Sequence, residues 1–315
     1  MTQSIPPEIA ARPIFILNPN SGGGRTGKRV GSIIDAIERA GLAADIVFTA
    51  HPGHGITLAE EAIDAGREFL VACGGDGTVY EVANGILGRA AGERVRLGTI
   101  ALGTGKDVAK GLGIARGNLA LRAILHGNER RIDAGRVTSR GEDGSEQVRY
   151  FLLEASAGWV PEISQSTPRW LKRLGDTAPY VVMAGVKMAG PMSRQFTLSI
   201  DGNHFDGHYN TVSVHNMELW GGDLVAAPGA APDDGILDVL RWGDLGRKAV
   251  LKAVDGQRKG GRHVDMEGID RHPAKVVEVS SPKRTRLDLD GELGGYLPAR
   301  IEVVRGALRF VAPAS

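Results

Sequence analysis

The sequence predicts a Rossmann-like α/β domain followed by an antiparallel β-sandwich domain. Up to about residue 129, strand-like and helix-like segments alternate, and the strands end in glycine-rich or polar loops. From residue 130 onward, short alternating segments are separated by turn dipeptides such as Asp201-Gly202 and Asp290-Gly291. A chain of 315 residues is long enough for both domains. We place them at 1–129 and 130–315, and leave open whether the C-terminal end returns to the first domain.

Residues 69–88 (FLVACGGDGTVYEVANGILG) are the segment around which the first domain is organised. The apolar run 69–73 is typical of a strand buried on both faces, and the glycines that follow allow a sharp turn. Thr78 is a suitable helix N-cap, and Glu81 three residues later would complete a capping box. The segment therefore predicts a strand, a tight turn and a helix that ends at Gly88.

A glycine turn before a helix presents N–H groups and the positive end of the helix dipole, which suits a phosphate group. Asp76 lies in this turn, where its carboxylate would repel phosphates unless a divalent cation lay between them. The segment by itself therefore favours a nucleotide–Mg²⁺ site. An ordinary strand–turn–helix is the structural alternative.

Polar residues also follow the other predicted strands of this domain, at 13–17, 44–49 and 95–101. Asn18, Thr49 and Asp76 each come at the end of a strand, and ligands of parallel sheets bind at the carboxyl ends of the strands. Residues 22–28 (GGGRTGK) match most of a P-loop, but Arg29 stands where that motif requires Ser or Thr. We therefore reject a Walker-type site.

Bulk properties exclude several classes of protein. A formal net charge of +1 does not favour a nucleic-acid-binding surface. The single cysteine, Cys73, excludes an intrachain disulfide and indicates a reducing compartment. The first eleven residues do not resemble a signal peptide, and no 18-residue apolar run predicts a transmembrane helix. We therefore expect a cytoplasmic protein.

The GGDGT turn, with Glu81, Asn84 and Gly85 after it, resembles the signature of the diacylglycerol kinase catalytic-domain superfamily, which includes bacterial lipid kinases and sphingosine and ceramide kinases. NAD kinases and 6-phosphofructokinases have a related turn. The resemblance implies their type of first domain, with ATP and Mg²⁺ as cofactors. It also covers the loops at 18–22 and 102–107, although Lys106 replaces the usual asparagine. The implied nucleotide-binding residues are Asn18, Pro19, Asn20, Ser21, Gly22, Thr49, Gly74, Gly75, Asp76, Gly77, Thr78, Val79, Tyr80, Glu81 and Thr104.

The resemblance gives roles to three acidic segments of the second half. The family's DDG stretch implies a structural Mg²⁺ bound by Asp234 and by the main-chain carbonyls of Ala231 and Ile236. Asp133, in an IDAG segment, would lie near the metal, and an exposed strand residue is an equal alternative. Glu292, in the DGE segment, matches the family's general base, and Asp76 would be the second catalytic acid.

The sequence as a whole resembles a bacterial lipid kinase that transfers the γ-phosphoryl group of ATP to a lipid hydroxyl at the inner face of the membrane. Diacylglycerol, ceramide, a sphingoid base or a similar lipid would fit, and a homodimer stays open. The predicted helix at 167–174 suits an anionic bilayer surface, although a half-buried helix with a solvated face is slightly favoured, and the one at 178–189 suits either an acyl pocket or the core. The alternatives are a soluble-substrate kinase of the NAD kinase type and an inactive nucleotide- or lipid-binding regulator.

Overall fold

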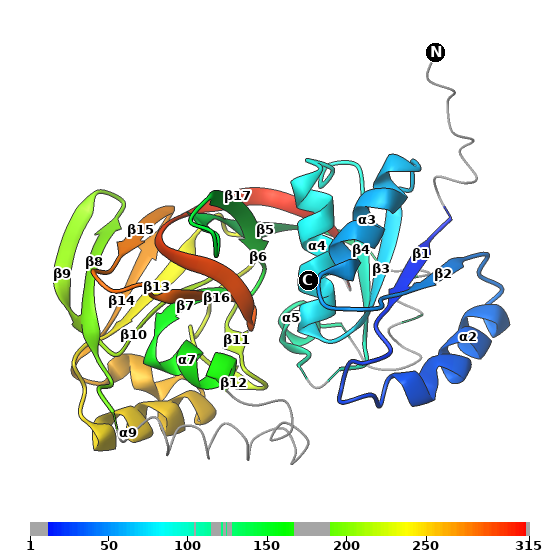
Figure 1. Ribbon diagram of the computed structural model, residues 1–315. Coiled ribbons are helices and arrows are strands. Elements are labelled where there is room, and N and C mark those ends of the chain that lie inside the picture. The colour runs from blue at the N-terminus through cyan, green and yellow to red at the C-terminus, as the bar shows by residue number, and fades with distance from the viewer. Residues whose placement is uncertain are drawn as a thin grey trace. The chain divides into compact units, whose positions relative to one another are not determined.

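The computed structural model describes residues 12–312 apart from 104, 115–120, 122–123, 125–127 and 167–189. The chain divides into two compact units (Figure 1). Unit 1 holds the chain up to Ile132 and again from Gly306, and unit 2 holds Asp133–Arg305. Two long strands, β5 (Asn128–Arg140) and β17 (Glu292–Ala312), each contribute residues to both units.

Unit 1 is built on a parallel sheet. Its strand order is β2 (Asp45–Phe48), β1 (Ile14–Leu17), β3 (Phe69–Gly74), β4 (Arg96–Ala101) and the end of β17. Every neighbouring pair in this order is parallel. Strands β1 and β3 are buried at every residue, as their apolar runs predict for strands covered on both faces. The predicted α/β class of the first half is therefore confirmed.

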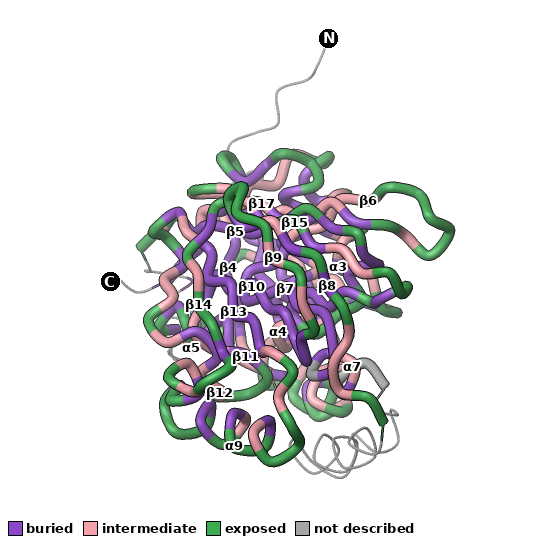
Figure 2. Tube along the Cα trace, turned by 90° about the vertical axis from the view of Figure 1, so that its left-hand side faces the viewer, coloured by how far each residue is buried: buried purple, intermediate pink, exposed green. Residues whose placement is uncertain are grey.

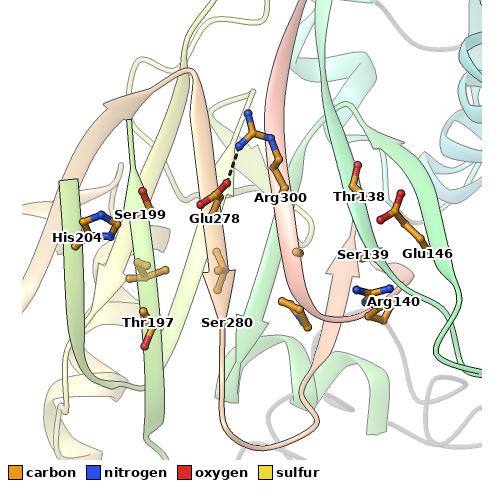
Figure 3. A pocket seen from close by; sticks show the side chains of 14 residues that line it. Thr138, Ser139, Arg140, Glu146, Thr197, Ser199, His204, Glu278, Ser280 and Arg300 are labelled. Carbon is orange, nitrogen blue, oxygen red and sulfur yellow. Dashed lines mark hydrogen bonds and ion pairs between the residues drawn. The ribbon is translucent and has the colours of Figure 1, made fainter. Parts of the chain in front are cut away.

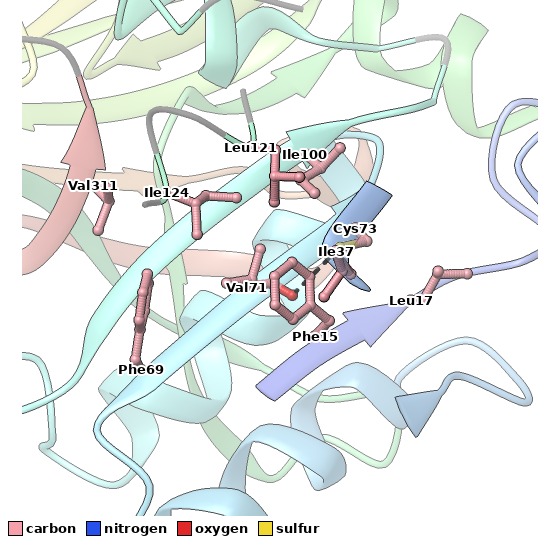
Figure 4. Close-up of a cluster of buried hydrophobic side chains, with 10 residues drawn as sticks. All are labelled: Phe15, Leu17, Ile37, Phe69, Val71, Cys73, Ile100, Leu121, Ile124 and Val311. Atoms are coloured by element: carbon pink, nitrogen blue, oxygen red, sulfur yellow. Dashed lines mark hydrogen bonds between the residues drawn. The ribbon is translucent and has the colours of Figure 1, made fainter. Parts of the chain in front are cut away.

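One face of this sheet packs on a hydrophobic cluster (Figure 4). Phe15, Val71 and Ile100 come from three neighbouring strands, and Ile37 comes from helix α2 (Val30–Arg39), which follows the short 3-10 helix η1 (Gly27–Arg29). Burial of each large apolar side chain contributes about 1.5–3 kcal/mol to stability. The cluster therefore stabilises the sheet that carries the loops at its carboxyl edge.

Helices α3 (His54–Asp64) and α4 (Asp76–Gly88) pack closely against each other. Gly85 of α4 lies at their contact, where an added Cβ atom would be 2.6 Å from the Cβ of Ala59 and 2.7 Å from the carbonyl oxygen of Ile56. Only a glycine allows the two helices to approach this far. A further helix of the unit, α5 (Asp107–Gly111), is short and follows β4.

Unit 2 is an antiparallel β structure with two sets of strands that share β17. One set has the order β14 (Ile269–Ala274), β13 (Leu237–Trp242), β10 (Thr211–His215), β7 (Glu154–Gly158), β16 (Arg286–Leu289) and β17. The other has the order β9 (Asn203–Tyr209), β8 (Arg194–Ile200), β15 (Val276–Ser280), β17, β5 and β6 (Glu146–Phe151). Strands β7, β10 and β13 are buried along their length, whereas β9 is largely exposed (Figure 2). The predicted β-sandwich class is confirmed.

Some connections in unit 2 agree with the prediction and others differ from it. Asp201-Gly202 and Asp290-Gly291 form hairpin turns with positive φ at both residues, as their composition predicts. Helices α7 (Trp159–Ser166) and α9 (Arg247–Arg258) were not predicted. A small ribbon of β11 (Leu219–Trp220) and β12 (Leu224–Val225) and the 3-10 helix η3 (Arg262–Asp265) complete the unit.

The helices predicted at 167–174 and 178–189 lie outside the described residues. Between α5 and β5 the structure describes Leu121 and Ile124 as helical. Among the helices that are described, none has the length and apolar character needed to cross a membrane.

The contact at Gly85 leads to a stability prediction. Gly85→Ala should lower the free energy of unfolding by about 1–3 kcal/mol, because the new methyl group forces α3 and α4 apart. Gly88→Ala is the matched control, since it lies at the end of the same helix and its Cβ would meet no atom closer than 3.9 Å. Urea unfolding of both variants measures the difference. Equal stabilities would contradict the packing described here.

Candidate active site

The loops at the carboxyl edge of the unit 1 sheet are joined by hydrogen bonds. After β1, the amide of Asn18 donates to the carbonyl of Cys73 (2.9 Å), and its side-chain amide donates to the hydroxyl of Thr78 (3.3 Å). After β4, the amides of Leu102 and Gly103 both donate to the carbonyl of Gly74 (2.7 and 3.0 Å). The structure therefore brings the loops after β1, β3 and β4 together, as their positions at strand ends predict.

The carboxylate of Asp76 ties the GGDGT turn to helix α5. Its two oxygens accept the amide N–H groups of Asp107 (3.0 Å) and Val108 (3.2 Å). Burial raises the pKa of Asp76 to about 6, while these two N–H groups and the charge of Lys110 act in the opposite direction and that of Asp107 adds to the rise. Above that pH the group is an anion at the edge of the sheet where a nucleotide is expected.

The predicted capping box is wrong. Helix α4 begins at Asp76 with Gly75 as its N-cap, so Thr78 lies in the first turn, buried, and accepts the hydrogen bond from Asn18. Glu81 instead accepts the amide N–H groups of Gly53 (2.7 Å) and Gly55 (2.8 Å). It therefore anchors the start of α3 rather than that of its own helix, which also fixes the loop that follows β2.

The other predicted nucleotide-binding residues have different surroundings. Thr49 is buried where β2 ends, and its amide donates to the carbonyl of Leu17 (2.9 Å). The loop after β1 folds back on itself, because the hydroxyl groups of Ser21 and Thr26 are hydrogen-bonded to each other (2.6 Å). Val79 and Tyr80 have buried side chains that belong to the core of unit 1. Thr104 lies outside the described residues. Pro19, Asn20 and Gly22 lie in the loop after β1, Gly74 ends β3, and Gly75 and Gly77 are the N-cap and a first-turn residue of α4.

Unit 2 brings Asp133 next to the predicted metal loop. One oxygen of its buried carboxylate accepts the amide N–H of Gly235 (2.6 Å), and its own amide donates to the carbonyl of Pro232 (2.6 Å). Asp234 is exposed and accepts the amide N–H of Ile236 (2.9 Å). No three acidic, histidine or cysteine side chains of the described residues gather into a metal site. A hard cation here would need the two carboxylates together with main-chain carbonyls, such as that of Ala231, and water.

Glu292 is exposed at the first position of β17, opposite Leu289 of β16. The Asp290-Gly291 turn that precedes it is held by two carboxylates. Asp290 accepts the amide N–H groups of three consecutive residues that lead into β7, namely Leu152, Leu153 and Glu154 (2.8, 2.8 and 2.9 Å). Asp288 accepts the amide N–H of Gly291 (2.8 Å).

Sequence reasoning missed Glu154, whose buried side chain is hydrogen-bonded to that of Asp288. In the segment YFLLEASAG it is a single acid in an apolar run, which is also typical of a strand residue that faces solvent. Nothing in the local pattern indicates that it pairs with a second acid. The Asp-x-Asp-Gly-Glu spacing could have indicated an acidic cluster, but not its partner on another strand.

A separate groove of about 470 Å³ lies on unit 2 (Figure 3). It is lined mainly by hydroxyl and charged side chains on β5, β6, β8, β9, β15 and β17, and Glu278 and Arg300 form an ion pair in it (2.6 Å). None of the predicted site residues lines it.

The comparisons with known proteins cover nearly the whole chain. Residues 12–137 match the diacylglycerol kinase catalytic domain, and residues 156–312 match the YegS C-terminal NAD kinase beta sandwich-like domain. A diacylglycerol kinase of Bacillus subtilis (strain 168) is 30% identical over 305 residues, which are 95% of each chain. One from Staphylococcus aureus (strain MRSA252) is 28% identical over 95% of this chain and 91% of its own.

Two solved structures share the fold. A diacylglycerol kinase from Bacillus anthracis str. Sterne superposes with a TM-score of 0.68 at 20% identity, over 96% of each chain. The yeast NADH kinase complexed with NADH superposes with a TM-score of 0.56 at 10% identity, over 97% of this chain and 84% of its own. At these identities the likeness concerns the fold alone. The matches to the two domain families and to the curated relatives show that this chain belongs to the diacylglycerol kinase family.

Proposed function

We propose that the chain is an ATP-dependent lipid kinase that transfers the γ-phosphoryl group to a lipid hydroxyl with the help of Mg²⁺. Membership of a kinase family supports phosphoryl transfer, and relatives named diacylglycerol kinase favour a lipid as the acceptor. The observation that carries the proposal is the hydrogen-bonded set of loops around the GGDGT turn at the carboxyl edge of the unit 1 sheet. Such an edge is where parallel sheets bind nucleotides.

The proposal assigns a separate role to each of the segments that resemble the family's motifs. The loops at 18–22 and 74–78 hold the triphosphate, and Asp76 directs the metal–phosphate unit while it fixes the loop after β4. When bound, Mg²⁺ neutralises the charge that develops on the phosphate oxygens. Glu292 accepts the proton of the lipid hydroxyl, because it is the exposed carboxylate of the DGE hairpin.

A second metal ion with a structural role would be held by Asp234, aided by Asp133 and the carbonyls of Ala231 and Ile236. The contact between Asp133 and the amide of Gly235 supports this assignment, because it places two carboxylates at one turn. Oxygen ligands of this kind suit a hard cation.

An NAD-kinase-type enzyme is the rival that the shared fold favours most, because the yeast NADH kinase superposes on most of the chain. Purified protein incubated with labelled ATP separates the alternatives. Label transfer to a diacylglycerol, ceramide or sphingoid base in mixed micelles supports the lipid kinase, and transfer to NAD supports the rival. Tight ATP binding without transfer to any acceptor would indicate an inactive regulator.

Glu292→Gln should lower turnover on the preferred lipid by about two or more orders of magnitude, because the hydroxyl proton loses its acceptor. The Michaelis constant for ATP should stay nearly constant. Glu146→Gln, which neutralises an exposed acid of the same unit, is the control and should keep full turnover. Near-normal turnover of Glu292→Gln would remove this residue as the base.

Mg²⁺ should raise the melting temperature of the protein, and Asp234→Asn should abolish most of that increase, because a bound ion stabilises only the folded state. Asp201→Asn is the matched control, since Asp201 also precedes a glycine in a tight turn of unit 2. Thermal unfolding at increasing Mg²⁺ concentration measures the effect without reference to activity. An unchanged Mg²⁺ response in Asp234→Asn would place the ion elsewhere.

A further inference from the structure

Glu154, the first residue of β7, is a buried acid with no assigned role. Only 4% of the residue is exposed, and its Oε2 atom has no hydrogen-bond partner among the described residues. Its side chain is hydrogen-bonded to that of Asp288, which is 2% exposed. Two carboxyl groups buried side by side are costly unless something compensates their charge, so this pair requires an explanation.

The strand register places Glu154 within a polar patch on one face of the sheet. Asp288 lies opposite Ser156 in the β16–β7 ladder, and His215 of β10 lies opposite Glu154. Because side chains alternate along a strand, these four residues share a face. The opposite face is apolar, with Ala155, Ala157, Leu287 and Leu289 all buried.

Charged groups surround the two acids on the neighbouring elements. They include Asp288 and Arg286 of β16, Asp290 in the turn that follows it, Glu292 of β17, His215 of β10, the pair Asp238–Arg271 of β13 and β14, and the pair Glu162–Arg194 of α7 and β8. Arg271 and Arg194 form ion pairs with Asp238 and Glu162, at 2.8 and 2.6 Å. Burial lowers the pKa of His215 to about 3, and the charges of His263 and Arg271 act in the same direction, so its imidazole is neutral.

A hydrogen bond between two carboxyl groups requires a proton on one of them, because an ionised carboxylate can only accept. Burial raises the pKa of Glu154 well above its ordinary range, and the neighbouring charge of Asp288 raises it further. At neutral pH protonated Glu154 donates a hydrogen bond to the carboxylate of Asp288.

Asp288 transmits the state of this pair to the hairpin that carries Glu292. Its Oδ1 atom accepts the amide N–H of Gly291 at 2.8 Å. The backbone of Asp290 and Gly291 has positive φ at both residues, 53° and 87°, so the turn depends on hydrogen bonds that hold this conformation. Glu292 directly follows it and pairs with Leu289 across the turn.

We propose that Glu154 is a positioning residue for phosphoryl transfer: the proton that it shares with Asp288 holds the Asp290-Gly291 turn, and with it Glu292, in the working conformation. This inference rests on the proposed role of Glu292 as the base. Loss of the shared proton at alkaline pH leaves two adjacent buried anions, whose repulsion weakens the bond from Gly291 to Asp288. Turnover then falls although Glu292 itself stays ionised.

Three variants test the role of Glu154 in turnover. Glu154→Leu removes the donor and should lower kcat about tenfold or more, with little change in the Michaelis constant for ATP. Glu154→Gln keeps an N–H donor at every pH, so it should restore most of kcat at neutral pH and abolish the alkaline fall in the pH–rate profile. Glu146→Gln, at an exposed acid of β6, should leave the wild-type profile unchanged. Wild-type kcat in Glu154→Leu, or an unchanged alkaline limb in Glu154→Gln, would overturn the proposal.

The shared proton can also be tested without activity. Because folding raises the pKa of Glu154, its contribution to stability is complete below the ordinary glutamate pKa and is lost as pH rises through the folded value. Glu154→Gln has no such loss, so its melting temperature relative to wild type should increase as pH rises from about 5 into the alkaline range. A constant difference would refute the shared proton. A pH-dependent difference in a protein that phosphorylates no lipid would refute the proposed function and leave the shared proton in place.

Discussion

The contact between two glycine turns is the constraint on which the carboxyl edge of the unit 1 sheet, the proposed nucleotide site, depends. A Cβ atom on Gly103 would lie 2.5 Å from the Cα of Gly75, and one on Gly105 would lie 2.6 Å from the carboxylate of Asp76. The loops after β3 and β4 can meet only because these positions have no side chain. Asp76 then fixes the contact by accepting two amide N–H groups from the start of α5. This gives the aspartate a structural duty alongside its proposed role toward the metal–phosphate unit.

In unit 2, carboxylates fix the turn that precedes Glu292, the proposed base. Asp290 accepts three amide N–H groups from residues 152–154, which lead into β7, and Asp288 accepts that of Gly291. The side chain of Glu154 is hydrogen-bonded to that of Asp288. Glu292 is the exposed member of this group, while the other three are buried. The division follows from physical chemistry, because a carboxylate that already accepts several amide N–H groups is a fixed anchor, whereas an exposed one can accept a proton from a substrate.

Elements that depend on neighbouring residues could be predicted from the sequence, whereas contacts between residues far apart in the chain could not. The apolar runs and glycine turns gave the strands of unit 1, and the Asp-Gly dipeptides gave the hairpins of unit 2. Glu81 was assigned to its own helix because the capping box is a local motif, yet its partners Gly53 and Gly55 lie 28 and 26 residues earlier. Glu154 escaped notice for the same reason, since its partner Asp288 is on another strand. Helix α9 was missed because it follows closely on strand signals.

The central claim is that the loops around the GGDGT turn bind the triphosphate of ATP. A crystal structure with Mg²⁺ and a non-hydrolysable ATP analogue tests it most directly. The account predicts triphosphate oxygens within hydrogen-bond distance of the backbone at 74–78 and of the loop at 18–22, with the metal on the side of Asp76. A well-ordered triphosphate that contacts neither loop would contradict the account.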